Sequence, residues 1–183
     1  SRGLGDVYKR QYLDRTEEKK IINDCYSSIL KLSGHPPVGW HTKSSTSPFT
    51  RDLLIEHGGF TYDSNAYNDD IPYVLKKNDQ KLVIIPYSFD TNDMRFDGNN
   101  GFVQGDDFNI YCKESFNQIL RETDDGSLRM MSIGLHPRII GRPGRIKGLE
   151  DFIKYIKTYE NVWIPKRMDI AKYCLERDSL NFF

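Results

Sequence analysis

Two carboxylates, an amide and a guanidinium gather in one short stretch of the chain, at Asp90, Asn92, Asp93 and Arg95. The stretch follows the hydrophobic run of residues 82–87, which is typical of a buried strand. In α/β proteins the loops that follow parallel strands carry the catalytic groups, so this position indicates an active-site loop. The alternative is an Asx-rich turn that only ends the strand, because Asp and Asn side chains readily bond their own backbone.

A second group of candidates begins with His136, after the apolar run of residues 129–135. Imidazole titrates near neutral pH, so this side chain suits a general acid, a general base or a metal ligand. A core histidine bonded to a backbone carbonyl is the alternative. Arg138, Arg142 and Arg145 follow at a predicted helix start, where cations are normally unfavourable. Guanidinium groups bind oxygens in a fork geometry, so this turn indicates an anionic or oxygen-rich partner, unless it is simply a solvated basic turn.

Further polar and aromatic residues lie at the ends of two earlier predicted strands. These residues are Trp40, His41, Asp63, Ser64, Asn65, Asn68, Asp69 and Asp70. Together with the two groups above, they place candidate side chains at one end of successive strands, which indicates one functional edge. No two histidines have the i, i+4 spacing of a helical metal site, so we assign no metal ligand within this chain.

Apolar periodicity and turn residues predict helices that alternate with strands. The expected helices are residues 14–32, 49–56, 108–123, 143–156 and 168–176. The expected strands are residues 38–42, 60–64, 82–87, 129–136 and 162–164, with a turn at 76–80 and a loop at 137–142. We expect Ser47 to cap the second helix, and Asp106 and Asp107 to cap the third. The alternation predicts an α/β fold with a parallel sheet and right-handed crossovers.

Five predicted strands are too few to close a barrel of the usual eight. Either the sheet is open, or residues 12–183 form the C-terminal portion of a single barrel domain. Residues 1–11 do not join the pattern and read as a non-native or disordered extension, which favours the second interpretation.

Composition excludes several classes of function. The chain of 183 residues has 26 Lys plus Arg and 26 Asp plus Glu, so no basic surplus suggests nucleic acid. It contains no apolar run of membrane-spanning length and no leader-like start. The 3 cysteines show neither metal-ligand spacing nor a disulfide pattern, so we expect a reducing compartment and a cytoplasmic protein.

Five segments of the chain together resemble the polysaccharide deacetylase superfamily, and more narrowly its allantoinase branch. These segments are residues 39–42, 58–73, 85–87, 90–96 and 134–145. The strings DSNAYNDDIPY and GRPGR make the resemblance specific, and it runs from about residue 14 to about residue 176.

The resemblance implies the C-terminal part of a distorted (β/α)7 barrel of the polysaccharide deacetylase (NodB-like) type. It also implies that the Asp-containing and His-containing motifs of the family lie upstream of this chain. In the deacetylase branch those motifs supply the base and the ligands of a divalent metal such as zinc. The allantoinase branch is expected to work without that metal, so no cofactor is expected in this interpretation.

The implied reaction is hydrolysis of the hydantoin ring of allantoin to allantoate. By resemblance, His136 is the general acid to the leaving nitrogen, and Asp90 or Asp93 orients it. Arg138 or Arg142 holds carbonyl or ureido oxygens, and Trp40 forms a flat apolar wall. Substrate-binding roles are also expected for Asn92 and Arg95. The base is expected in the upstream portion.

Two other functions remain open at this stage. The first is a metal-dependent N-deacetylase that acts on polysaccharide or chitin-like sugars. The second is an inactive fragment or a non-catalytic barrel domain, and the chain alone is expected to be inactive. The expected partners are a small-molecule substrate such as a cyclic ureide and, by resemblance, further copies of the protein, with neither nucleic acid nor membrane.

Overall fold

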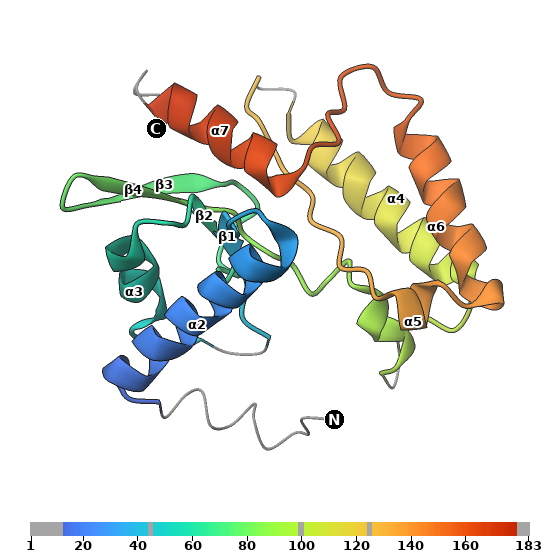
Figure 1. Ribbon diagram of the computed structural model, residues 1–183. Helices are drawn as coiled ribbons and strands as arrows, with labels where there is room; N and C mark the ends of the chain where they lie inside the picture. The colour runs from blue at the N-terminus through green and yellow to red at the C-terminus, as the bar shows by residue number, and fades with distance from the viewer. Residues whose placement is uncertain (1–12, 44–45, 99–100, 124–125, 179–183) are drawn as a thin grey trace. The chain divides into compact units, whose positions relative to one another are not determined.

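The computed structural model describes residues 13–43, 46–98, 101–123 and 126–178 (Figure 1). The predicted extension at residues 1–11 therefore lies outside the described residues. The helices are α2 (Arg15–Ser33), α3 (Thr50–His57), the 3-10 helix η2 (Asp93–Phe96), α4 (Gly105–Arg121), α5 (Pro137–Ile140), α6 (Pro143–Ile156) and α7 (Arg167–Asp178). The strands are β1 (Gly39–Trp40), β2 (Tyr62–Asp63), β3 (Tyr73–Lys77) and β4 (Gln80–Ile84).

The strands form one sheet in the order β1-β2-β4-β3. β1 pairs with β2 in parallel, and β2 pairs with β4 in parallel, while β3 is antiparallel to β4. The α/β class with parallel strands and helices is therefore confirmed. The sheet is not closed among the described residues.

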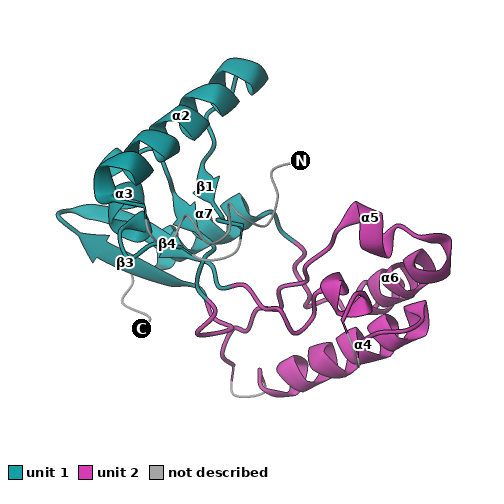
Figure 2. Cartoon of the chain, turned by 90° about the horizontal axis from the view of Figure 1, so that it is seen from below, with its two compact units in different colours: residues 1–66, 72–86, 165–183 teal, residues 67–71, 87–164 magenta. Residues whose placement is uncertain are grey.

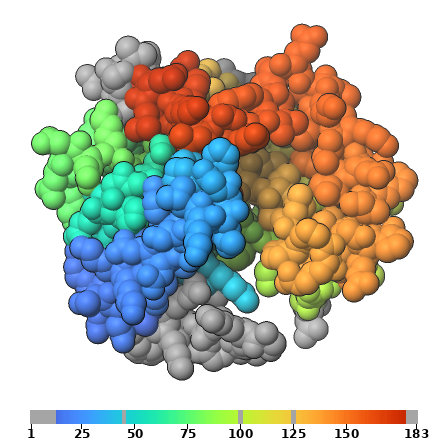
Figure 3. Space-filling view, in the orientation of Figure 1, coloured from blue at the N-terminus to red at the C-terminus, as the bar shows by residue number. Residues whose placement is uncertain are grey.

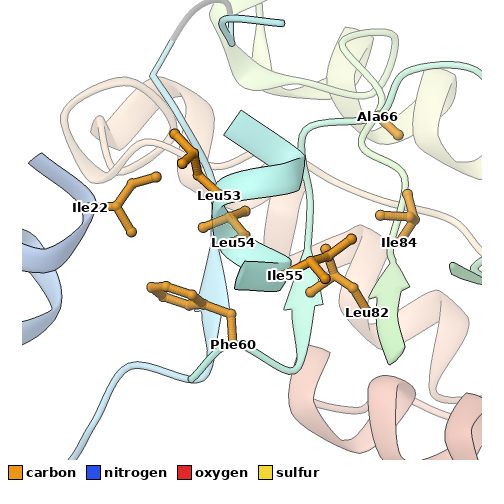
Figure 4. Packing of buried hydrophobic residues seen from close by; sticks show 8 residues of the cluster. All are labelled: Ile22, Leu53, Leu54, Ile55, Phe60, Ala66, Leu82 and Ile84. Atoms are coloured by element: carbon orange, nitrogen blue, oxygen red, sulfur yellow. The ribbon is translucent and has the colours of Figure 1, made fainter. Parts of the chain in front are cut away.

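The chain divides into two compact units, each with its own core (Figure 2). Unit 1 comprises residues 1–66, 72–86 and 165–183, and unit 2 comprises residues 67–71 and 87–164. The core of unit 1 contains Ile22, Leu53, Leu54, Ile55, Phe60, Ala66, Leu82 and Ile84 (Figure 4). The core of unit 2 contains Phe96, Phe102, Phe108, Cys112, Phe116, Ile139, Ile140 and Phe152.

The first helix, α2, begins and ends within one residue of the predicted helix at residues 14–32. Asp14 is the N-cap of α2, and its side chain accepts hydrogen bonds from the backbone N–H groups of Thr16 and Glu17. Gly34 ends the helix with a left-handed φ of 73°, which costs glycine little. The space-filling view shows α2 on the surface of unit 1 (Figure 3). No helix in the described part of the chain is long and apolar enough to cross a membrane.

The turn predicted at residues 76–80 is shorter in the structure, because Lys76, Lys77 and Gln80 belong to strands. β3 runs to Lys77, and β4 begins at Gln80. Only Asn78 and Asp79 form the turn, with φ values of 50° and 60°. Asn and Asp tolerate positive φ, and two such residues make the tight hairpin that joins antiparallel strands. This hairpin also places one antiparallel strand in a sheet that was expected to be entirely parallel.

Two other predicted strands are not strands in the structure. In the part of the chain that the structure describes, residues 129–136 form a single isolated parallel bridge, between Gly134 and Asn92. Residues 162–164 have no strand partner among the described residues, and Trp163 and Ile164 are exposed. Apolar runs favour extended chain, but a strand also needs a neighbour to accept its hydrogen bonds. The loop predicted at residues 137–142 instead contains the short helix α5.

The predicted caps of two helices are also displaced. α3 begins at Thr50, and Ser47 instead accepts a bond from the N–H of Phe49, 2.9 Å away. α4 begins at Gly105, so Asp106 and Asp107 lie inside its first turn. The Asp107 carboxylate accepts bonds from the N–H groups of Val103 and Gln104, and these bonds lower its pKa.

Candidate functional site

His136 and Asp93 form a close pair in unit 2. Imidazole Nδ1 lies 2.6 Å from Asp93 Oδ1, and the backbone N–H of His136 donates to Oδ2 at 2.6 Å. The N–H of Ile140 also donates to Oδ2, at 3.3 Å. The Asp93 side chain is fully buried, whereas that of His136 is 28% exposed. An ionised carboxylate makes Nδ1 the donor, which leaves Nε2 of the imidazole for a substrate.

Short backbone bonds hold this pair in register. The N–H of Asp93 donates to the carbonyl of Gly134 at 2.9 Å, and the N–H of Gly134 donates to the carbonyl of Thr91 at 3.3 Å. His136 is the N-cap of α5, whose first residue is Pro137. These two backbone bonds help to fix the distance between His136 and Asp93, although the segment before His136 pairs at too few residues to form a strand.

Asn92 caps η2 and has both ends of its amide engaged. Its Oδ1 accepts a bond from the N–H of Met94 at 2.8 Å, and its Nδ2 donates to the hydroxyl of Tyr87. The side chain is buried. These contacts describe a positioning residue for Asp93, while direct substrate binding by Asn92 stays a prediction.

Asp90 and Arg95 belong to a different cluster of the same loop. Asp90 Oδ1 accepts a bond from the Tyr111 hydroxyl at 2.7 Å, and this bond raises the pKa of Tyr111. Arg95 donates to the backbone carbonyl of Asp90 at 3.0 Å, and its guanidinium lies over the rings of Tyr111 and Phe102. The structure therefore brings Asp93 to His136, and it ties Asp90 to α4.

The arginines that follow His136 surround the start of α6. Arg138 and Arg142 are exposed, and Arg142 Nε donates to the carbonyl of Arg138 at 3.2 Å. Arg145 lies 3.8 Å from Asp97 and over the ring of Phe96. These contacts give Arg145 a structural role. For Arg138 and Arg142, the binding of substrate oxygens stays a prediction.

Trp40 lies in unit 1 and is only partly exposed. Its ring packs edge-on against Phe60, with centroids 5.5 Å apart, and its Nε1–H donates to Thr42 at 2.9 Å. The indole is thus part of the packing around the unit 1 core. The role of a substrate wall stays a prediction for this residue.

Sequence reasoning missed Tyr111, Tyr87 and Gly134. Tyr87 lies in one of the segments that carry the resemblance, but nothing in the sequence assigns a role to either tyrosine, because their partners are distant in the chain or lie in an irregular loop. Gly134 did offer a signal, since a glycine two residues before a candidate catalytic residue can mark a close backbone approach. A Cβ on Gly134 would lie 2.2 Å from both Asn92 Nδ2 and the Tyr87 hydroxyl.

Among the described residues, no three His, Cys, Asp or Glu side chains gather as a site that could hold a metal ion. His136 and Asp93 by themselves form a pair that is suited to proton transfer. That the reaction needs no metal stays a prediction.

Comparison with known proteins gives the chain clear relatives, although no known protein-family model matches it. A Schizosaccharomyces pombe protein named as a polysaccharide deacetylase is 38% identical over 171 residues, which are 85% of this chain and 53% of that protein. The crystal structure of a probable polysaccharide deacetylase from Pseudomonas aeruginosa PAO1 matches with a TM-score of 0.84 and 40% identity, over 94% of this chain and 57% of that one. The crystal structure of PuuE allantoinase matches with the same score and identity, over 94% of this chain and 56% of that one.

The chain thus spans about half the length of the relatives it matches, at 53% and 57% of the first two. The sequence likeness and the fold together support its place in the polysaccharide deacetylase superfamily.

Proposed function

We propose that this chain belongs to a hydrolase of non-peptide carbon–nitrogen bonds, and that its reaction is the allantoinase-type opening of allantoin to allantoate. The observation that carries the proposal is the contact of 2.6 Å between His136 Nδ1 and the buried carboxylate of Asp93. The likeness to PuuE allantoinase, at 40% identity, supports the choice of substrate.

In the proposed step, water attacks the ring carbonyl and the carbon–nitrogen bond breaks. Protonated His136 gives the proton on Nε2 to the leaving nitrogen, while the Nδ1–H bond to Asp93 holds the ring and stabilises its positive charge. A base must take the proton of the water. By resemblance, we expect this base in the portion of the protein upstream of this chain.

The surrounding residues have supporting roles in this proposal. Arg138 and Arg142 hold carbonyl or ureido oxygens, since both guanidinium groups are exposed beside His136 in the chain. Asp90 and Arg95 keep the loop that carries Asp93 in place through their contacts with Tyr111 and with each other.

A metal-dependent polysaccharide N-deacetylase is the second candidate, supported by the names of the relatives from Schizosaccharomyces pombe and Pseudomonas aeruginosa. The residues described here do not form a metal site. By resemblance, a zinc deacetylase would take its main ligands from the portion upstream of this chain. We also propose that the protein forms homo-oligomers and that its substrate is a small cyclic ureide.

The deciding experiment assays the protein, expressed from its whole reading frame, with allantoin and with a chitin oligosaccharide, each with and without a chelator. Allantoin hydrolysis that resists the chelator is expected. Release of acetate from the oligosaccharide that the chelator abolishes would instead establish the deacetylase.

His136→Ala tests the assignment of the acid in the same assay. Removing a general acid costs about 10²- to 10⁴-fold in rate, so turnover should fall by at least about 100-fold. His35→Ala is the matched control, because His35 is an exposed histidine outside the candidate site and should keep wild-type turnover. Near-normal turnover by His136→Ala would show that this residue is not the acid.

A further inference from the structure

Two solvent-exposed aromatic rings stack on each other in unit 2. Tyr67 and Phe89 are parallel within 8°, with centroids 4.9 Å apart, and they are 44% and 57% exposed. Tyr87 meets both rings edge-on, at 6.0 Å and 5.5 Å. We call these three residues the aromatic platform.

A partly buried hydrogen bond holds the platform in place. The Tyr87 hydroxyl accepts a bond from the amide of Asn92, whose other end caps η2. This bond restrains the ring of Tyr87, which packs edge-on against the two exposed rings. A site that is formed before its ligand arrives loses little entropy on binding.

The platform shares a loop with the candidate acid–base pair. The N–H of Asn92 donates to the carbonyl of Phe89 at 3.3 Å, which closes a turn directly before Asp93. Four residues of chain span at most about 14 Å, so the Cα atoms of Phe89 and Asp93 lie within that distance. The stacked rings and Asp93 therefore belong to one short loop.

From this arrangement we infer that the aromatic platform binds the substrate by stacking on the apolar face of a ring. The substrate class is thus a ring compound that carries the scissile carbon–nitrogen bond, either a planar cyclic ureide or an N-acetylated sugar. This inference rests on the proposed function. It assigns the aromatic surface to Phe89 and Tyr67, whereas Trp40 packs against Phe60 in unit 1.

Substitution of Phe89 separates binding from chemistry. Phe89→Ala should raise KM for the ring substrate about tenfold, which is the fold-change of one aromatic contact, and should change kcat less than about twofold. Phe89→Trp should restore KM, because it restores a flat ring. Leu128→Ala is the matched control, since Leu128 is as exposed as Phe89 in the same unit and lies outside the platform.

The two possible rings are compared directly, with allantoin in one arm and tetra-N-acetylchitotetraose in the other. A rise in KM in either arm supports the platform and identifies its ring. An unchanged KM for Phe89→Ala in every arm that shows turnover overturns it. If Phe89→Ala does not fold, Phe89→Leu keeps an apolar side chain without the flat face and gives the same comparison.

Calorimetric titration of both ligands, in a His136→Ala background, distinguishes failure of the platform from failure of the proposed function. Weaker binding on adding Phe89→Ala supports the platform even if no turnover is found for the wild type. Equal binding with and without Phe89→Ala overturns the platform and leaves the proposed reaction untouched.

Discussion

The carboxylate of Asp93 accepts hydrogen bonds from the backbone and also contacts the imidazole of His136. Oδ2 accepts the N–H groups of His136 and Ile140, and Oδ1 faces Nδ1 of His136. A buried charge persists only where hydrogen bonds replace its hydration, and here three donors do so. The same bonds that make the charge tolerable therefore also fix the ring that is proposed to move a proton.

Asp93→Asn should lower both activity and stability. The amide replaces one acceptor oxygen with a donor, so either a backbone N–H or Nδ1–H loses its partner. We expect turnover to fall about 10²- to 10⁴-fold and the free energy of unfolding to fall by about 1–3 kcal/mol. Steady-state kinetics and urea unfolding measure these changes.

Asp97→Asn is the control for that change, because Asp97 is an exposed carboxylate just past η2. It should leave turnover and unfolding close to wild type. Wild-type turnover by Asp93→Asn would contradict an orienting role for this carboxylate.

The sequence predicted His136 and Asp93 as candidates because each follows a predicted apolar strand. It left open whether Asp90 or Asp93 meets the imidazole, since that choice depends on where η2 turns each side chain. Tyr111 reaches Asp90 from α4, twenty-one positions along the chain. Periodicity reports which face of a helix is apolar, but it does not report which loop a polar tip will reach.

At the level of elements, the long helices were predicted well, whereas two of the five predicted strands, residues 129–136 and 162–164, are not strands in the structure. α2 and α6 carry their own end signals, such as Asp14, Gly34 and Pro143. Strands depend on distant partners, so residues 162–164 have the composition of a strand but form none in the part of the chain that the structure describes. The pairing of α4 with α6 likewise depends on contacts that no local pattern displays (Figure 2).

Helices α4 and α6 approach each other closely at two glycines, Gly105 and Gly148. A Cβ on Gly148 would lie 2.0 Å from the backbone carbonyl oxygen of Gly105, so the helices would have to separate. We expect Gly148→Ala to lower the free energy of unfolding by about 1–3 kcal/mol, although alanine favours helix. Gly144→Ala in the same helix has nothing within 4 Å and should leave stability equal or raise it by up to about 1 kcal/mol. Chemical unfolding of both variants checks this, and equal stability of the two would contradict the close approach.

At the scale of the whole molecule, the three thiols report on the two units separately. Cys112 is buried in unit 2, Cys174 is buried in unit 1, and Cys25 is exposed on α2. Burial raises the pKa of Cys112 to about 12 and also raises that of Cys174. The thiolate is the reactive form, so burial and a raised pKa both protect these two residues.

Iodoacetamide at pH 8 should therefore modify Cys25 in the folded protein and leave Cys112 and Cys174 unmodified. All three should react in urea. Mass spectrometry of peptides after a time course gives the rate at each thiol. Rapid modification of Cys112 without denaturant would contradict its burial.

The raised pKa of Cys112 also fixes the direction of a pH effect on stability. The unfolded thiol loses its proton near the ordinary value of 9.0, while the folded thiol keeps it up to about pH 12. Above pH 9 the folded state binds more protons, so the free energy of unfolding must fall as pH rises. One such group contributes a slope of at most about 1.4 kcal/mol per pH unit between these values.

Other groups titrate in the same range, so the slope is compared between wild type and Cys112→Ala. The variant starts less stable because it leaves a cavity, but it should lose less stability between pH 8 and pH 11, and parallel curves would contradict the raised pKa.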